Sequence, residues 1–101
     1  MFIAVYKWKI IPGKDNEFQS QWEMGTKIFR DDHEALGSRL HQSEDGTYMA
    51  YAQWPSREIY FKKRELSFAH AEHLAKMHDC IEKSEPATFF EVMSDYLVPQ
   101  L

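Results

Sequence analysis

A histidine and an arginine near the middle of the chain combine two side chains that can do acid–base chemistry. His41 and Arg39 lie two residues apart, shortly before the dipeptide Asp45-Gly46. An imidazole can accept a proton near neutral pH, and a guanidinium can hold the oxyanion that results. Residues two apart in a β-strand point to the same side of the sheet, so the two side chains can act on one ligand if this segment is a strand.

The segment 37–56 predicts the β-hairpin that would position these two side chains. Asp45-Gly46 stands between two runs of alternating polarity, which is a strong hairpin signal. With these two residues as the loop, His41 pairs with Ala50, whereas a loop one residue longer would shift the pairing. One face of the hairpin then carries Arg39, His41, Ser43, Tyr48, Ala50, Ala52 and Trp54. The other face, expected to be core beneath a helix, carries Leu40, Gln42, Met49 and Tyr51.

The other candidates for metal binding or reactivity are three histidines and a cysteine, and for these we predict no chemical role. His70 and His73 are three apart on a predicted helix and share a face, but a third and fourth metal ligand are not evident. We therefore predict solvated histidines at these positions and at His78, and no metal site. Cys80 has no helix N-terminus nearby to lower its pKa, so a reactive thiolate is not expected.

The composition is that of one globular domain spanning residues 1–101. Hydrophobic residues make up 44% of the chain and aromatic residues 15%, far from the disordered class. The net charge is −4 and the basic residues are scattered, apart from the run 62–64, so no nucleic-acid partner is expected. The single cysteine favours a reducing compartment, and no apolar run approaches the roughly 20 residues of a membrane span. We expect a cytoplasmic protein without membrane contact.

Apolar periodicity predicts strands and helices on both sides of the hairpin. Asp15 or Asn16 is the expected cap of the first helix and Gly37 its stop, Ser56 caps a short helix, and Pro86 closes the helical region. The predicted elements are a strand over 2–11, a helix to about 34, the hairpin, a short helix over 56–63, a helix from about 67, and a strand over 87–98. The apolar face of the last helix carries Phe68, Ala71, Leu74, Ala75, Met77 and Ile81.

This order predicts a ferredoxin-like βαββαβ fold. It is an α+β architecture with a four-stranded antiparallel sheet in the order 4-1-3-2 and both helices on one face. The opposite face is then expected to carry a patch too apolar to leave in water, formed by Phe2, Tyr6, Trp8, Tyr48 and Trp54. A second copy of the sheet would cover this patch, so we predict a homodimer.

Several short motifs occur together in a characteristic order. They are the turn Pro12-Gly13-Lys14, Phe18 with Trp22 on the first helix, Gly37 before the second strand, and the run Tyr51-Ala52-Gln53-Trp54-Pro55-Ser56. Through these motifs essentially the whole chain resembles the antibiotic biosynthesis monooxygenase-like family of dimeric α/β barrels. The resemblance implies two facing sheets and a cavity in each subunit. It also implies activities found among such proteins, which include oxidation of phenolic or quinol-type polyketides with molecular oxygen and no bound cofactor.

These expectations give a first hypothesis for function. The protein would be a cofactor-independent monooxygenase-like homodimer acting on an aromatic, polycyclic or quinol-type small molecule. Such a reaction needs the anion of the substrate, so His41 would be the general base and Arg39 would hold the oxyanion. Aromatic walls that bind the flat substrate would come from Tyr6, Trp8, Tyr48 and Trp54.

Three alternatives remain open at this stage. The cavity can belong to a non-catalytic ligand-binding or stress-associated dimer, or it can bind haem through His73. Haem-degrading relatives carry asparagine and tryptophan where this chain has about Tyr6 and Lys63, which makes haem the weaker alternative. Finally, Arg39 and His41 can be ordinary polar residues of an edge strand, with the indole of Trp54 in a dimer core.

Overall fold

A computed structural model describes residues 1–98 of the chain. None of the helices in this range is both long enough and apolar enough to cross a membrane. The elements are β1 (Phe2–Ile10), α1 (Asp15–Asp32), β2 (Gly37–Gln42), β3 (Tyr48–Trp54), α2 (Arg57–Phe61), α3 (Phe68–Asp79), β4 (Ile81–Ser84) and β5 (Thr88–Glu91).

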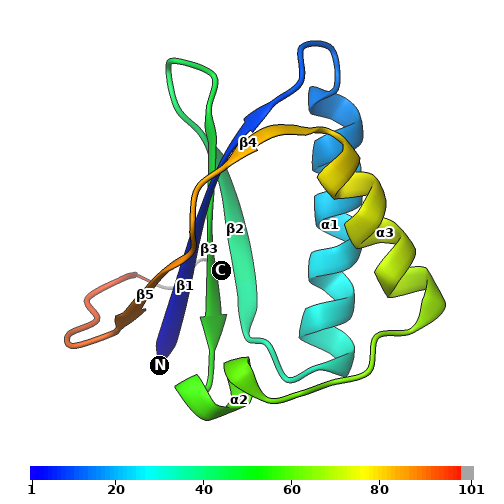
Figure 1. Ribbon diagram of the computed structural model, residues 1–101. Helices are drawn as coiled ribbons and strands as arrows, with labels where there is room; N and C mark the ends of the chain where they lie inside the picture. Colours follow the sequence, from blue (N-terminus) through cyan, green and yellow to red (C-terminus); the bar gives the residue numbers. More distant parts are fainter. Residues whose placement is uncertain (99–101) are drawn as a thin grey trace.

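The strands form one antiparallel sheet in the order β2-β3-β1-β4, and β5 also pairs with β1. Helices α1 and α3 lie side by side over one face of this sheet, and α2 lies near the end of β3 (Figure 1). The ferredoxin-like βαββαβ fold and the predicted strand order are confirmed.

The last strand of the fold is split, which the sequence pattern did not predict. The single predicted strand over 87–98 is replaced by β4 and β5, both paired with β1. Pro86 lies between them, where its missing N–H would break a continuous ladder. Ile81, which we assigned to the helix, begins β4 and pairs with Ile10, since α3 already ends at Asp79.

Serine caps begin the two shorter helices, and the cap at Ser56 was predicted. The Ser56 hydroxyl accepts a hydrogen bond from the backbone N–H of Ile59 (3.2 Å), and the Ser67 hydroxyl accepts one from His70 (3.1 Å). Each bond satisfies one of the N–H groups that a helix leaves unpaired at its start.

Both ends of α1 differ slightly from the prediction. Lys14 occupies the N-cap without a side-chain bond, and Asp15 lies in the first turn, where its charge favours the helix dipole. The helix ends at Asp32 and not near Glu34. Glu34 itself takes a positive φ of 67°, and Gly37, the predicted stop, begins β2 with a φ of 126°.

The hairpin loop has three residues and not the two that we predicted. Glu44, Asp45 and Gly46 form the loop, which the bond from the Ser43 N–H to the Thr47 carbonyl closes at 2.9 Å. The Asp45 carboxylate accepts bonds from the Ser43 hydroxyl and from the Thr47 N–H and hydroxyl, and these bonds lower its pKa to about 2. Gly46 takes the left-handed conformation (φ 90°) typical of three-residue hairpin loops.

The extra loop residue shifts the pairing of β2 against β3 by one position. His41 pairs with Met49 and Leu40 with Ala50, so the predicted pairing of His41 with Ala50 is wrong. A shift of one residue moves every side chain of a strand to the other face. Arg39 and His41 therefore share a face with Met49 and Tyr51.

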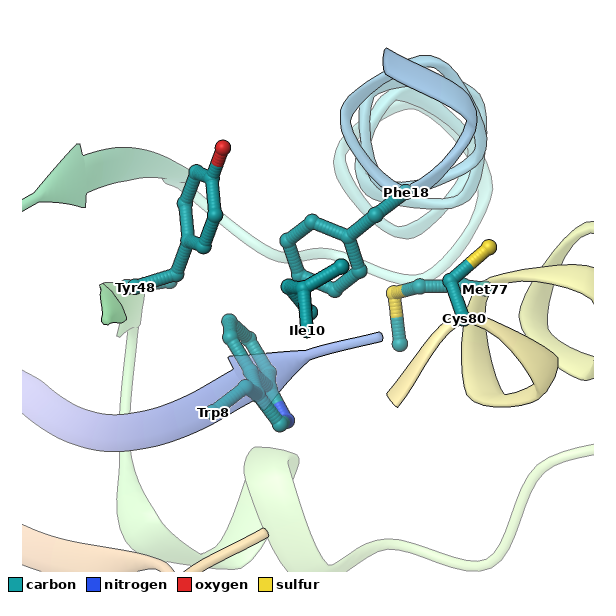
Figure 2. Packing of buried hydrophobic residues seen from close by; sticks show 7 residues of the cluster. Trp8, Ile10, Phe18, Tyr48, Met77 and Cys80 are labelled. Atoms are coloured by element: carbon teal, nitrogen blue, oxygen red, sulfur yellow. The ribbon is translucent and has the colours of Figure 1, made fainter. Parts of the chain in front are cut away.

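The helices cover the face of the sheet that we expected to remain open. Pairs such as Phe2–Trp54 and Trp8–Tyr48 place the aromatic side chains of β1 and β3 on this covered face. In Figure 2, Phe18 points from α1 toward the sheet, and its ring centroid lies 5.3 Å from that of Trp8 and 5.2 Å from that of Tyr48. The predicted exposed aromatic patch is thus mainly core.

Helix α3 buries a histidine in place of a phenylalanine. His70 is fully buried against α1, with its ring 4.3 Å from that of Phe29 and 5.4 Å from that of His33, whereas Phe68 is 85% exposed. The prediction of a solvated histidine at position 70 is therefore wrong. The spacing of apolar residues along α3 does not specify which of its turns contacts α1, and this contact is what buries His70.

Acidification is expected to destabilise the fold through His70. Burial and, next to it, the neighbouring His33 lower its pKa below the value of about 6.5 in unfolded chains. The Gly25 carbonyl and Asp32 oppose this with smaller effects, and His73 adds the smallest lowering. The unfolded chain then binds more protons below about pH 6.5, so the free energy of unfolding should fall as the pH drops through this range. Urea denaturation at a series of pH values should show this fall.

Two variants test whether His70, and not another histidine, causes this fall in the free energy of unfolding. His70→Leu should lose most of the decrease below pH 6.5, whereas His78→Gln, at an exposed position, should keep it. An unchanged acid dependence in folded His70→Leu would contradict the assignment.

Candidate ligand-binding cavity

A cavity of about 520 Å³ lies between the sheet and the helices. This volume is within the range of roughly 300–1,000 Å³ that is usual for small-molecule sites. The strands contribute Tyr6, Trp8, Gly37, Ser38, Ala52 and Trp54 to its lining, and the helices and their connections contribute Trp22, Thr26, Phe29, Ala35, Tyr60, Phe61, Arg64, Leu74, Met77 and His78.

Small residues leave this space between the aromatic side chains. Ala52 stands on β3 two residues before Trp54 and pairs with Ala4 on β1 and Ser38 on β2, and Ala35 and Gly37 line the cavity where the chain passes from α1 into β2. Ala50, the other alanine of β3, is 1% exposed and packs in the core beside Phe18. The short side chain at position 52 is therefore the one that contributes to the cavity.

Two phenols meet at the wall of the cavity. The hydroxyls of Tyr6 on β1 and Tyr60 on α2 are 2.6 Å apart, which is a short hydrogen bond. Burial, with the hydrogen bond to Tyr60, raises the pKa of Tyr6 far above its ordinary value. The Tyr6 phenol therefore stays protonated at neutral pH. The contact between the two hydroxyls uses one O–H, so the pair has a second O–H that can donate to a ligand.

The indole of Trp54 brings an unsatisfied donor to the same region. Its side chain is 3% exposed, and its Nε1–H has no hydrogen-bond partner among the described residues. A buried polar group without a partner costs roughly 1–3 kcal/mol, so such groups usually find one. Because Trp54 lines the cavity, an acceptor atom of a bound ligand is a possible partner.

Arg64 covers the Trp54 indole and carries the positive charge of the lining. Its guanidinium carbon lies 4.7 Å from the Trp54 ring centroid and 6.0 Å from that of Phe29. One terminal nitrogen, Nη2, donates to the carbonyls of Ile59 (2.6 Å) and Tyr60 (3.1 Å), which fixes the side chain against α2.

The structure brings together three of the four aromatic residues that we predicted to bind a substrate. Tyr6, Trp8 and Trp54 all line the cavity. Tyr48 lies deeper in the core, where its hydroxyl donates to the Asp15 carboxylate at 2.9 Å, and it is not among the lining residues.

Arg39 and His41 lie on the other face of the sheet, away from these aromatic residues. The His41 ring stacks on Tyr51 with centroids 5.7 Å apart, and its Nδ1 is 3.2 Å from the Met49 carbonyl oxygen. The predicted grouping of His41 with Tyr48 and Trp54 on one face is wrong because the register differs. The catalytic roles suggested for Arg39 and His41 remain predictions.

Sequence reasoning missed the contributions of Tyr60 and Arg64. The position of Tyr60 was indicated in part by the sequence. A helix capped at Ser56 starts close to the end of β3, so residues of its last turn can lie near Trp54. Arg64 belonged to the basic run 62–64, which we considered only in relation to a nucleic-acid partner. Its contact with Trp54 depends on the course of the chain after α2, which no local pattern specifies.

Metal and haem ligands do not gather at this cavity. Across residues 1–98 there is no cluster of three or more His, Cys, Asp or Glu side chains that could hold a metal ion. His73, the residue considered for haem, has its Nδ1 2.7 Å from the Gln21 side-chain oxygen and is not among the lining residues. Cys80 is buried, and burial raises the pKa of its thiol.

The fold and the cavity together define a small α+β protein with a candidate ligand cavity between a ferredoxin-like sheet and its helices. No protein-family model matches the sequence, and no curated protein does. Solved structures do match over nearly the whole chain. Among them are chains named as antibiotic biosynthesis monooxygenases, so the chain has the fold that its sequence resemblance implied.

Three of these structures illustrate the likeness. A candidate antibiotic biosynthesis monooxygenase from Bordetella bronchiseptica superposes with a TM-score of 0.76 at 14% identity, covering 92% of this chain and 97% of the other. A variant of SnoaB, a cofactor-independent oxygenase from Streptomyces nogalater, gives 0.74 at 14% identity, with 94% and 95% covered. Rv0793 from Mycobacterium tuberculosis gives 0.73 at 11% identity, with 95% and 98% covered.

Proposed function

We propose that the protein is a cofactor-independent oxygenase that binds a flat aromatic molecule in the cavity between sheet and helices. The observation that carries this proposal is the convergence of the Trp54 N–H and the Tyr6–Tyr60 phenol pair on an otherwise mainly apolar cavity. The same fold occurs in SnoaB, which is a cofactor-independent oxygenase, and this supports the choice of reaction.

The proposed reaction needs only the substrate and molecular oxygen. An anthrone-type CH2 group next to a carbonyl loses a proton, and the resulting carbanion transfers electrons to O2. One oxygen atom forms the new C=O group, and the other leaves as water with the two hydrogens of the CH2 group. The protein would hold the substrate anion through hydrogen-bond donors and exclude bulk water.

Oxygen uptake with dithranol, an anthrone, tests this function. The proposal expects catalysed consumption of O2 above the rate of spontaneous oxidation, one labelled oxygen atom in the product from 18O2, and no loss of rate after treatment with a chelator. A rate equal to the protein-free reaction, for dithranol and for 1-naphthol, would contradict an oxygenase of this kind.

A non-catalytic binding protein is the second candidate. The lining of the cavity contains no carboxylate among the described residues, and its one imidazole, that of His78, is exposed. A site without a buried general base is suited to binding, and proton transfer from a carbon acid then depends on His78 or water. Saturable binding of dithranol analogues without oxygen uptake would favour this candidate.

The outer face of the sheet supports the proposed homodimer. No described helix covers this face (Figure 1), and it carries the half-buried side chains of Ile3, Val5, Met49 and Tyr51. Beside it, several large apolar side chains of the last described residues are exposed, among them Tyr96 at 93%. Structures of this fold commonly form dimeric barrels, and a stable dimer typically buries roughly 1,600 Å².

Light scattering after size exclusion should give the mass of two 12.0 kDa chains. Tyr51→Glu should produce a folded monomer because it places a charge in the middle of the proposed interface. Phe68→Glu is the matched control, because Phe68 is exposed on the helical side of the molecule and its replacement should leave the dimer intact. A wild-type monomer at micromolar concentration would contradict the dimer.

A further inference from the structure

Arg64 is a cation in the lining of the cavity without a carboxylate partner. No Asp or Glu of residues 1–98 lies within ion-pair distance of its guanidinium. Its two protein partners, the carbonyls of Ile59 and Tyr60, are neutral and both bind Nη2. A guanidinium has five N–H donors, so the two on Nη1 and the one on Nε remain without a protein partner in the described structure.

The other polar groups nearby also supply donors. The Trp54 Nε1–H is unpaired, and the Tyr6–Tyr60 pair has one O–H that its internal bond does not use. None of the lining residues is Asp or Glu. A neutral aromatic molecule would leave the positive charge of Arg64 without a counter-ion, whereas an anionic oxygen would meet both the charge and the donors.

We infer that the cavity selects aromatic ligands that carry an anionic oxygen, and that Arg64 is the residue responsible for this selection. The inference rests on the proposed function because it assigns the charge of the molecule bound in that cavity. Stacking on Trp54 at 4.7 Å and the two bonds to α2 hold the guanidinium plane in place. A fixed fork of donors can bind a carboxylate or enolate oxygen with little further loss of side-chain entropy.

Isothermal titration with a matched pair of probes tests the inference. The probes are 2-naphthoate and the uncharged 2-naphthamide, which share one ring system, and the wild-type protein should bind the naphthoate at least 10-fold more tightly at pH 7.5. Arg64→Gln should weaken naphthoate binding at least 10-fold and leave naphthamide binding nearly unchanged. Arg64→Lys, which keeps the charge without the planar fork, should retain only part of the preference.

Arg57→Gln is the control for loss of a stacked arginine. Arg57 lies 4.7 Å from the ring centroid of Phe61 but is not among the residues that line the cavity, so its replacement should leave the preference intact. Equal affinity of the wild-type protein for both probes would overturn the inference and leave the aromatic cavity of the proposed function standing. Failure of both probes to bind would overturn the inference and also contradict the proposed function. Because the wild-type comparison needs no variant, poor folding of Arg64→Gln would not prevent the test.

Discussion

Phe18→Ala is expected to lower the free energy of unfolding by about 3–5 kcal/mol, the usual cost of removing a buried aromatic ring. Phe18 is fully buried and contacts the rings of Trp8 and Tyr48, so its loss would leave a cavity between α1 and the sheet (Figure 2). Urea denaturation followed by circular dichroism measures the change.

Phe68→Ala is the matched control for this substitution. The Phe68 side chain is 85% exposed, so its removal should change the free energy of unfolding by less than about 0.5 kcal/mol. Similar losses in the two variants would show that the core does not lie between α1 and the sheet.

Tyr60→Phe is expected to lower the rate of dithranol oxidation by about 10²-fold or more. It removes one hydroxyl of the phenol pair, and donors that stabilise a developing oxyanion usually contribute 10²–10³ in rate. The ring of Tyr60 remains, and with it the packing against Phe2 and Trp54, so the fold should be unaffected. Initial rates of oxygen uptake, on protein shown to be folded, measure the effect.

Tyr6→Phe distinguishes the roles of the two phenols. If Tyr60 donates to the ligand while accepting from Tyr6, Tyr6→Phe should reduce the rate less than Tyr60→Phe does. Full activity in both variants would remove the phenol pair from the proposed chemistry. Loss of activity in His41→Ala with full activity in Tyr60→Phe would instead place the reaction on the outer face of the sheet.

Much of the fold follows from local signals in the sequence. The alternation over β1, the serine cap of α2, and the order of the elements together predicted the sheet order and the helices on one face. These features depend on neighbouring residues and on general rules of chain connection, so one sequence is sufficient to predict them.

The errors arose where specific side-chain contacts, and not apolar periodicity, decide the structure. The hydrogen bonds of Asp45 with Ser43 and Thr47 lengthen the hairpin loop by one residue, and this reverses the faces of β2 relative to β3. His70 is buried because α3 packs its first turns against Phe29 and His33. Neither outcome can be derived from the spacing of apolar residues alone.

The candidate site was predicted only in part for the same reason. Tyr6, Trp8 and Trp54, which we predicted to bind a substrate, line the cavity, although the prediction placed them on the uncovered face. Tyr60 and Arg64 complete the polar part of the cavity through contacts made across the fold. The position of a strand end and of the helix after it was predictable, but the side chains that meet there were not.

The central claim is that ligands bind between the sheet and the helices. All three tryptophans of the chain, Trp8, Trp22 and Trp54, line the cavity, so their indole N–H signals in a 1H–15N spectrum report on this site directly. Titration with 2-naphthoate should shift all three signals, and that of Trp54 should move downfield as its unpaired N–H gains an acceptor. Indole signals that stay unchanged while those of His41 and Tyr51 move would place the ligand on the outer face and contradict the account.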